Sequence, residues 1–174
     1  QMPEGLPRIL IVDASILFSF FKKDSIRRAL IEELPGIGCK LIDPAFVFKE
    51  LSGKEERIKK YGKINELSFS FLFSLLESKI ESFPDNVYKE FLAEANKISP
   101  HAEGTNDDPY FALALAFDFP IWSDETAFKK QDKVKIFNTG GLSKLLESKT
   151  KPESEDRPET KSGGEDEDSA SEAK

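Results

Sequence analysis

Cysteine and histidine are almost missing from this 174-residue chain, which has one of each. With a single cysteine, Cys39, the chain can form no disulfide framework and no site built on several thiolates. We expect Cys39 to be a small buried apolar residue in a protein of a reducing compartment. His101 lies in a predicted surface loop, and no other motif of a Ser-His-Asp triad accompanies it.

Long apolar runs are also lacking. No stretch approaches the roughly 20 apolar residues that a helix needs to cross a bilayer. Residues 1–5 (QMPEG) are not followed by the apolar segment of a signal peptide. These absences predict a soluble protein with cytoplasmic localisation and no membrane contact.

The net charge of −7 is concentrated at the C-terminal end of the sequence. Residues 150–174 hold nine acidic and four basic residues, whereas the first 149 residues hold 23 acidic and 21 basic ones. The acidity of the whole chain therefore argues little against a nucleic-acid partner. We predict one domain over residues 1–148 and a disordered acidic low-complexity tail over residues 149–174, because the tail has no aliphatic residue larger than alanine. A solubility extension is favoured for the tail over an autoinhibitor that mimics phosphates.

Strand and helix patterns alternate along the predicted domain. Short apolar segments predict strands at residues 8–13, 40–42, 79–83, 121–123 and 134–137. Helical patterns fill the intervals, at residues 14–22, 25–34, 44–51, 54–62, 65–77, 84–98, 109–117 and 141–148. This alternation predicts an α/β fold, a three-layer α/β/α sandwich with a mainly parallel central sheet. We assign Phe69, Phe71, Phe73 and Trp122 to the core, with a dimer interface as the lesser alternative for the phenylalanines.

Acidic residues stand where these apolar segments begin or end. Six of them are candidates for one shared site: Asp13, Glu50, Asp107, Asp108, Asp124 and Glu125. A carboxylate beside the core is costly to desolvate unless it is paired, hydrogen-bonded or bound to a metal. Ligands of parallel sheets bind outside the carboxyl ends of the strands, where such side chains would meet. Hard oxygen ligands select Mg²⁺ or Mn²⁺, and two such ions could activate water for phosphodiester hydrolysis.

Other hydrolase classes fit this pattern less well. A glycosidase needs only two carboxylates. A phosphatase of the haloacid dehalogenase class needs a second aspartate two residues after the first, and Ser15 occupies that position.

Four short motifs, in this order, resemble those of the PIN-domain ribonucleases of the VapC-like kind. They are residues 11–15 (IVDAS), 44–51 (PAFVFKEL), 107–114 (DDPYFALA) and 121–125 (IWSDE), and the resemblance spans about residues 8–140. It implies Mg²⁺- or Mn²⁺-dependent hydrolysis of RNA by water, without a covalent intermediate. Asp13, Glu50 and Asp107 would hold the ions, and Ser15 would orient a ligand or a water molecule.

Two motifs leave a choice between neighbouring acidic residues. In the third motif the family's aspartate stands two residues before Pro109, which selects Asp107 as ligand and leaves Asp108 as a cap or as a group behind the ligands. The fourth motif usually reads Ser or Thr, any residue, then Asp. Strict register puts Glu125 in the last position, with Asp124 one position early, and both remain candidates.

The resemblance leaves two functions open. One is a metal-dependent endoribonuclease, either a toxin neutralised by an antitoxin or an RNA-processing enzyme. The other is a catalytically degenerate PIN-like module that binds RNA or protein without cleavage. The expected partners are an RNA substrate and an antitoxin or RNA-processing protein, and a homodimer is left open. Four lysines are candidate contacts for the RNA backbone: Lys22, Lys23, Lys129 and Lys130.

Overall fold

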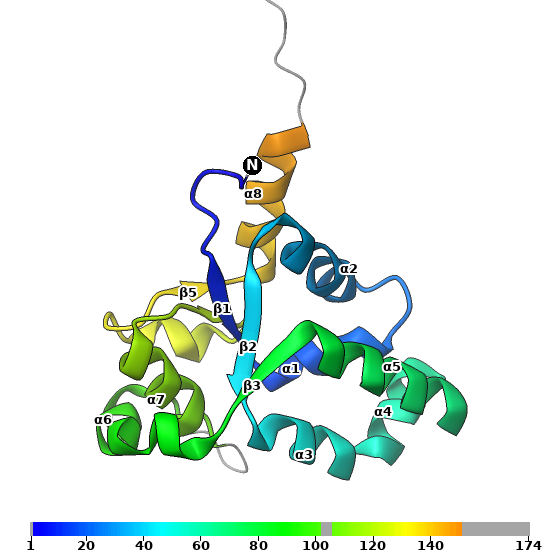
Figure 1. Ribbon diagram of the computed structural model, residues 1–174, viewed down its shortest axis with the longest axis horizontal. Helices are drawn as coiled ribbons and strands as arrows, with labels where there is room; N and C mark the ends of the chain where they lie inside the picture. Colours follow the sequence, from blue (N-terminus) through cyan, green and yellow to red (C-terminus); the bar gives the residue numbers. More distant parts are fainter. Residues whose placement is uncertain (1, 102–105, 151–174) are drawn as a thin grey trace, which may run out of the picture.

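The computed structural model describes residues 2–101 and 106–150, and in these residues five strands form one sheet (Figure 1). The strands are β1 (Ile9–Val12), β2 (Lys40–Pro44), β3 (Ile80–Phe83), β4 (Ile121–Trp122) and β5 (Ile136–Phe137). Their order across the sheet is β3-β2-β1-β4-β5, and every neighbouring pair is parallel.

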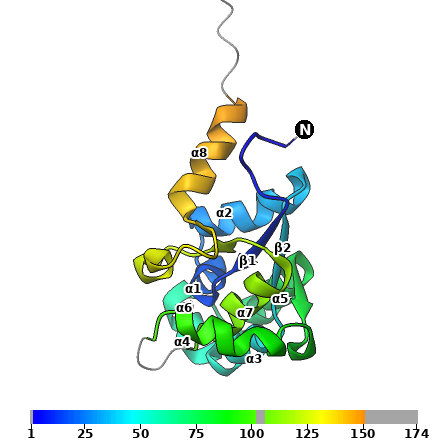
Figure 2. The same cartoon turned by 90° about the vertical axis from the view of Figure 1, so that its left-hand side faces the viewer.

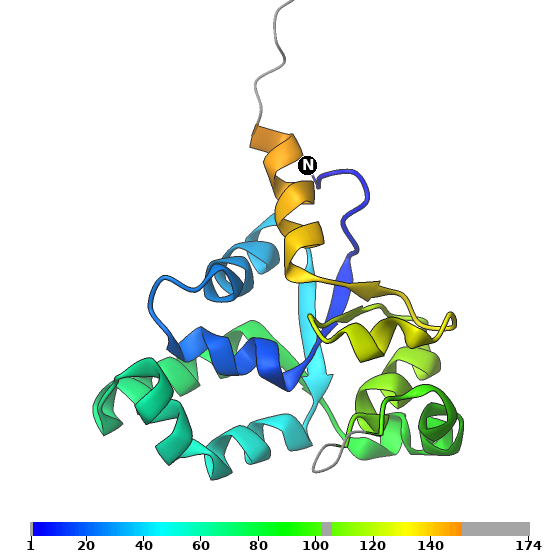
Figure 3. The ribbon, with the colours of Figure 1, turned by 180° about the vertical axis from the view of Figure 1, so that it is seen from behind.

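Helices cover both faces of this sheet. The described α-helices are α1 (Ala14–Phe18), α2 (Ile26–Glu33), α3 (Phe46–Gly53), α4 (Glu55–Gly62), α5 (Glu66–Lys79), α6 (Leu92–Ile98), α7 (Asp108–Phe117) and α8 (Thr139–Thr150). Short 3-10 turns are η1 (Ser19–Phe21), η2 (Leu34–Ile37), η3 (Asp85–Val87), η4 (Lys89–Phe91) and η5 (Thr126–Lys130). Figures 1 and 3 show α6 and α7 on one side of the sheet and α2, α4 and α5 on the other. The predicted three-layer sandwich with a parallel sheet is confirmed.

The core is built around β1, whose residues Leu10, Ile11 and Val12 are fully buried. A central parallel strand is covered on both faces, which explains why its sequence is continuously apolar rather than alternating. Trp122 of β4 is also fully buried, as predicted, and its indole N–H donates a hydrogen bond to Thr139 Oγ1 at 3.0 Å. Cys39 is buried as well, and burial raises the pKa of its thiol to about 12.

At Pro44 the structure differs from the prediction of a helix over residues 44–51, because this residue ends β2 instead of opening the helix. Asp43 and Pro44 pair with Ser82 and Phe83 of β3, so the strand extends beyond the predicted residues 40–42. Helix α3 begins two residues later, at Phe46.

The structure also differs from the prediction of a single helix over residues 84–98. The structure breaks it into η3, η4 and α6, with Tyr88 between the two turns at φ −128° and ψ −7°. Tyr88 is almost completely buried, and its backbone angles lie outside the helical region, so the helix is interrupted at this residue.

The prediction that Phe71 belongs to the core is wrong, because its side chain is exposed. Phe69 and Phe73, four residues apart on α5, face the core, whereas Phe71 lies about 200° around the helix and is 68% exposed. The alternation of phenylalanines therefore does not determine burial once the segment is helical.

Helix α8 continues through Thr150, beside α2 and at the end of the molecule opposite α3 (Figure 2). The predicted tail from residue 151 to 174 lies outside the described residues. None of the described helices is long and apolar enough to cross a membrane.

Candidate functional site

The carboxyl ends of β1 and β4 meet where the chain changes its direction across the sheet. From β1 the chain passes through α1 and α2 to β2 on one side, whereas β4 joins the other side of β1 after α7. Crevices at such a switch point are the usual ligand sites of parallel sheets. Asp13 follows β1 and Ser123 follows β4 at this crevice.

Four of the predicted carboxylates line one hollow of about 440 Å³ at this edge of the sheet. They come from four different segments of the chain: Asp13, Glu50, Asp107 and Glu125. Asp13 and Asp107 are buried, and Glu50 is exposed on α3. The fold thus brings together one acidic residue from each of the four motifs.

Two serine hydroxyls orient the carboxylate of Asp13. Ser15 Oγ donates to Asp13 Oδ2 at 3.0 Å, and Ser123 Oγ donates to the same oxygen at 2.8 Å. Ser123 Oγ also accepts a hydrogen bond from the backbone N–H of Glu125 at 3.1 Å. Ser123 therefore links two acidic residues of the hollow. It was not selected from the sequence, although it occupies the hydroxyl position of the fourth motif.

Asp124 does not line the hollow, because its carboxylate is engaged elsewhere. Arg27 donates to Oδ2 from Nε at 2.8 Å, with its NH2 group at 2.7 Å from the same oxygen. Thr139 donates from its backbone N–H to Oδ1 and from its hydroxyl to Oδ2. Burial alone raises the pKa of Asp124, but the hydrogen bonds from Thr139 and Arg27 outweigh it and lower that pKa. Asp124 thereby holds the start of α8 to α2.

Glu125 has the opposite electrostatic setting. Desolvation of its carboxyl, with the negative charge of Asp13 as the second cause, raises the pKa of Glu125. A carboxylate that is repelled by its neighbours is of the kind that a cation would stabilise.

Asp107 and Asp108 point to different parts of the molecule. Asp107 is the N-cap residue of α7, yet its side chain makes no capping hydrogen bond and lines the hollow. Asp108 accepts hydrogen bonds from Asn96 Nδ2 at 2.9 Å and from Ser99 Oγ, and so ties α7 to α6.

Asp43 is a buried acidic residue that the sequence reasoning missed. It is 0% exposed in β2, its Oδ1 accepts from the backbone N–H of Val12 at 3.2 Å, and no described residue hydrogen-bonds to its Oδ2. Burial, and then the charge of Asp13, raise the pKa of Asp43 well above its ordinary range. The signal in the sequence was an acidic residue inside the apolar run 41–44 (LIDP).

Tyr110 closes the hollow beneath these carboxylates. Its hydroxyl oxygen accepts a hydrogen bond from the backbone N–H of Ala14 at 3.2 Å. Burial, and then the charges of Asp43 and Asp13, raise the pKa of Tyr110, so its hydroxyl stays protonated.

A family model decides how this arrangement is classified. The model of the PIN domain matches residues 11–139, which contain all four motifs. The chain belongs to the PIN domain family. PIN domains are generally nucleases, and the predicted family is confirmed.

A solved structure shares the fold of this PIN domain. VapBC2 from Rickettsia felis, bound to a DNA fragment from their promoter, matches with a TM-score of 0.56 and 17% sequence identity. The match covers 75% of this chain and 98% of that chain. The comparison with curated proteins found no match.

Basic and aromatic side chains share the hollow of the PIN domain with the carboxylates. Arg27, Lys54 and Arg57 line it together with Phe18 and Tyr61. The predicted RNA contacts Lys129 and Lys130 lie in η5 and are not among its lining residues, and neither are Lys22 and Lys23.

The donors of the hollow fit a hard divalent cation, since all four acidic residues offer carboxylate oxygens. After burial, the charge of Asp13 contributes to the raised pKa of both Asp43 and Glu125, and a cation bound beside Asp13 would offset that contribution. In the described part of the chain, no three acidic, histidine or cysteine side chains are already grouped around one ion position. Mg²⁺ often keeps several water ligands and uses only one or two carboxylates, so this spacing is compatible with it.

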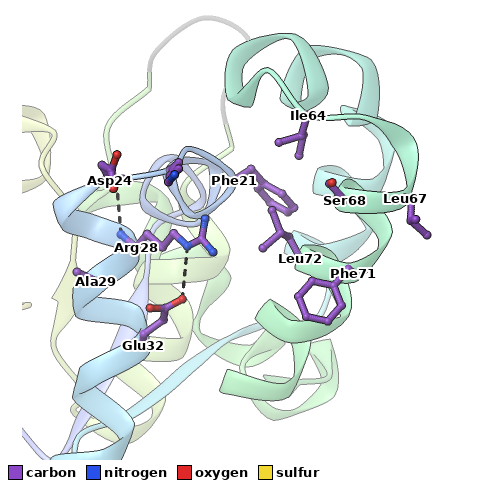
Figure 4. Close-up of a pocket in the computed structure, with 12 residues that line it drawn as sticks. Phe21, Asp24, Arg28, Ala29, Glu32, Ile64, Leu67, Ser68, Phe71 and Leu72 are labelled. Atoms are coloured by element: carbon purple, nitrogen blue, oxygen red, sulfur yellow. Dashed lines mark hydrogen bonds and ion pairs between the residues drawn. The ribbon is translucent and has the colours of Figure 1, made fainter.

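A larger hollow of about 880 Å³ lies between α2 and α5 (Figure 4), and the four carboxylates of the smaller hollow are not among its lining residues. Its lining is mostly apolar and includes Phe21, Ile64 and Leu72. Leu67 and Phe71 at its border are 80% and 68% exposed. Apolar surface of this kind usually serves contact with another protein rather than catalysis.

Proposed function

We propose that this PIN domain is a metal-dependent endoribonuclease that hydrolyses RNA phosphodiesters by attack of water. The gathering of four carboxylates from four distant motifs in one hollow carries the proposal. Basic residues at the same hollow, Lys54 and Arg57, supply the positive charge that a polyanion needs. Family membership supports nuclease chemistry independently of this geometry.

The proposed roles follow from the contacts of each residue. Asp13, Glu50, Asp107 and Glu125 would hold Mg²⁺ or Mn²⁺, directly or through water. The bound cation would lower the pKa of a water molecule and stabilise charge on the phosphate. Ser15 and Ser123 keep the Asp13 carboxylate in one orientation by donating to its Oδ2.

Glu125 rather than Asp124 completes the proposed site. Arg27 and Thr139 occupy both oxygens of Asp124, and its lowered pKa reflects a carboxylate already compensated. Glu125 lines the hollow and lacks such compensation, as its raised pKa indicates.

Glu125→Gln and Asp124→Asn should separate these roles. We expect Glu125→Gln to lower Mn²⁺-dependent cleavage of a mixed RNA pool by about tenfold or more, with an unchanged free energy of unfolding. Asp124→Asn should retain cleavage but destabilise the fold by about 1–3 kcal/mol, because it weakens charge-assisted hydrogen bonds. Gel assays of cleavage and urea unfolding of both variants provide the measurement. The reverse pattern would assign the fourth ligand to Asp124.

The second candidate function, a PIN-like module that binds without cleaving, is favoured by two observations. The fourth motif has a glutamate where an aspartate is usual, and the described side chains form no ready three-ligand group. Calorimetric titration with Mn²⁺ distinguishes the candidates. A nuclease should bind Mn²⁺ in a way that Glu50→Gln weakens, whereas a degenerate site should show no such binding.

We infer that the apolar groove between α2 and α5 is covered by a partner protein. The structural neighbour is a complex of two proteins, and the groove of this chain exposes Leu67 and Phe71. An antitoxin-like or RNA-processing protein would be such a partner, and a second copy of the chain is the competing occupant.

Light scattering after gel filtration separates these occupants. With a partner protein as occupant, the purified chain should be a monomer, and Phe71→Glu should leave its mass unchanged because the site faces solvent. A wild-type dimer that Phe71→Glu dissociates would instead assign the groove to self-association.

A further inference from the structure

We propose that Tyr61 is a stacking platform for a base of the RNA, and that a second hollow beyond Tyr61 receives the neighbouring nucleotide. This inference rests on the proposed function, because it extends the path of the substrate away from the carboxylates.

The carboxylate hollow and the second hollow adjoin, and together they define the proposed path of the RNA. The second hollow, also about 440 Å³, is bordered by η1, the residues before α2 and the end of α4. Ser19, Arg27 and Tyr61 line both hollows. An RNA strand that runs from the carboxylates into the second hollow must therefore pass Tyr61.

The ring of Tyr61 is supported from below and open to solvent. Its centroid lies 5.1 Å from that of Phe18 at an interplanar angle of 53°, while the residue is 41% exposed. The guanidinium of Arg57 lies 6.0 Å from the centroid of the Phe18 ring, so Arg57, Phe18 and Tyr61 form one cluster of side chains. A ring held in place by a second ring loses little conformational freedom when a base stacks on it.

Positive charge lies on both sides of this ring. Lys54 and Arg57 line the carboxylate hollow, and Lys22 and Lys23 line the second one, where Asp24 offsets one of the two charges. Lys22 Nζ lies 5.3 Å from the centroid of the Tyr61 ring, and its flexible stem allows it to move to a phosphate when a base takes that place. Arg27 is not counted as a phosphate ligand, because Asp124 already pairs with it.

A base can stack on Tyr61 only if the face of the base is not already stacked on a neighbouring base. Bases in a duplex are stacked on one another, so aromatic platforms of this kind select unpaired nucleotides. The alternative role of Tyr61 is structural, as a side chain that only packs on Phe18. If Tyr61 only packs on Phe18, an apolar side chain can replace it without loss of RNA binding. A stacking platform instead needs an aromatic ring at this position.

Binding of a fluorescein-labelled eight-nucleotide RNA in EDTA, followed by fluorescence anisotropy, tests the platform without cleavage. Tyr61→Leu keeps apolar packing but removes the aromatic face, and it should raise the Kd by roughly tenfold. Tyr61→Phe should restore wild-type binding. Phe71→Leu, which removes an exposed aromatic ring at the other groove, is the matched control and should leave the Kd unchanged. A duplex of the same sequence should bind without sensitivity to Tyr61→Leu.

The second hollow has its own readout. Lys22→Ala with Lys23→Ala should reduce the salt dependence of binding for the eight-nucleotide RNA, because fewer counterions are released. A three-nucleotide RNA that occupies only the carboxylate hollow should show no such change.

The path is overturned if Tyr61→Leu, confirmed as folded by its unfolding temperature, binds the RNA as the wild type does. An equal loss in Tyr61→Leu and Phe71→Leu would overturn it too. Failure of the nuclease proposal looks different: binding would depend on Tyr61 while Mn²⁺ produced no cleavage. Cleavage that is unaffected by every Tyr61 variant would sink the path and leave the nuclease proposal intact.

Discussion

Replacing Asp13 with asparagine should abolish RNA cleavage while leaving the fold intact. Two serine hydroxyls donate to Asp13 Oδ2 and hold this carboxylate in one orientation toward the hollow. Losing a group behind a metal ligand typically costs about 10- to 100-fold in activity or affinity, and losing a ligand itself should cost more. Asparagine retains an oxygen that can accept from Ser15 and Ser123.

The fold should tolerate this change for two reasons. Asp13 is the N-cap residue of α1, but its side chain makes no capping hydrogen bond that asparagine would lose. Removing its charge also removes one cause of the raised pKa of the buried Asp43, a shift that costs stability at neutral pH. The temperature of unfolding should therefore be equal to that of the wild type or higher.

Asp108→Asn is the matched control for this experiment. It makes the same chemical change in another motif, but on a side chain that contacts Asn96 and Ser99 of the α6 segment. We expect near wild-type cleavage from this variant. Equal Mn²⁺-dependent cleavage by wild type and Asp13→Asn, with both proteins folded, would eliminate the nuclease proposal.

Replacing Asp43 with asparagine should stabilise the metal-free protein at neutral pH. In the folded state burial and the charge of Asp13 raise the pKa of Asp43 well above its ordinary value of 3.8. Between 3.8 and the raised pKa, the folded state holds a proton that the unfolded chain has released. The free energy of unfolding must then fall as the pH rises through this window, by up to about 1.4 kcal/mol per pH unit. Asparagine resembles the protonated carboxyl and does not titrate.

Urea unfolding at several pH values in EDTA measures this effect. Wild type should lose stability between pH 4 and pH 7, and the loss should be smaller in Asp43→Asn. Below the ordinary carboxyl pKa both proteins should respond alike to pH, because the wild-type side chain is then protonated in both states. Parallel stability curves for the two proteins across the whole range would contradict a buried neutral Asp43.

The site could be predicted from the sequence as far as its motifs have a fixed local spacing. Asp13 follows a buried strand, and Asp107 stands two residues before the proline that opens α7, so both positions are set by neighbouring residues. The choice between Asp124 and Glu125 could not be made in this way. Asp124 is withdrawn from the hollow by Arg27 and Thr139, which lie 97 and 15 positions away in the chain.

The order of strands and helices follows from local patterns of residues, because apolar periodicity and helix caps act over a few residues. The apolar run Ile9–Val12 and the N-cap hydrogen bonds of Ser25 and Asn65 are of this kind. Which polar groups are buried together depends instead on contacts between residues that are far apart in the chain. Asp43 meets the backbone of Val12 across 31 positions, and Ser123 meets Asp13 across 110. Desolvation and charge repulsion depend on distances in space, and those distances exist only once the sheet is assembled.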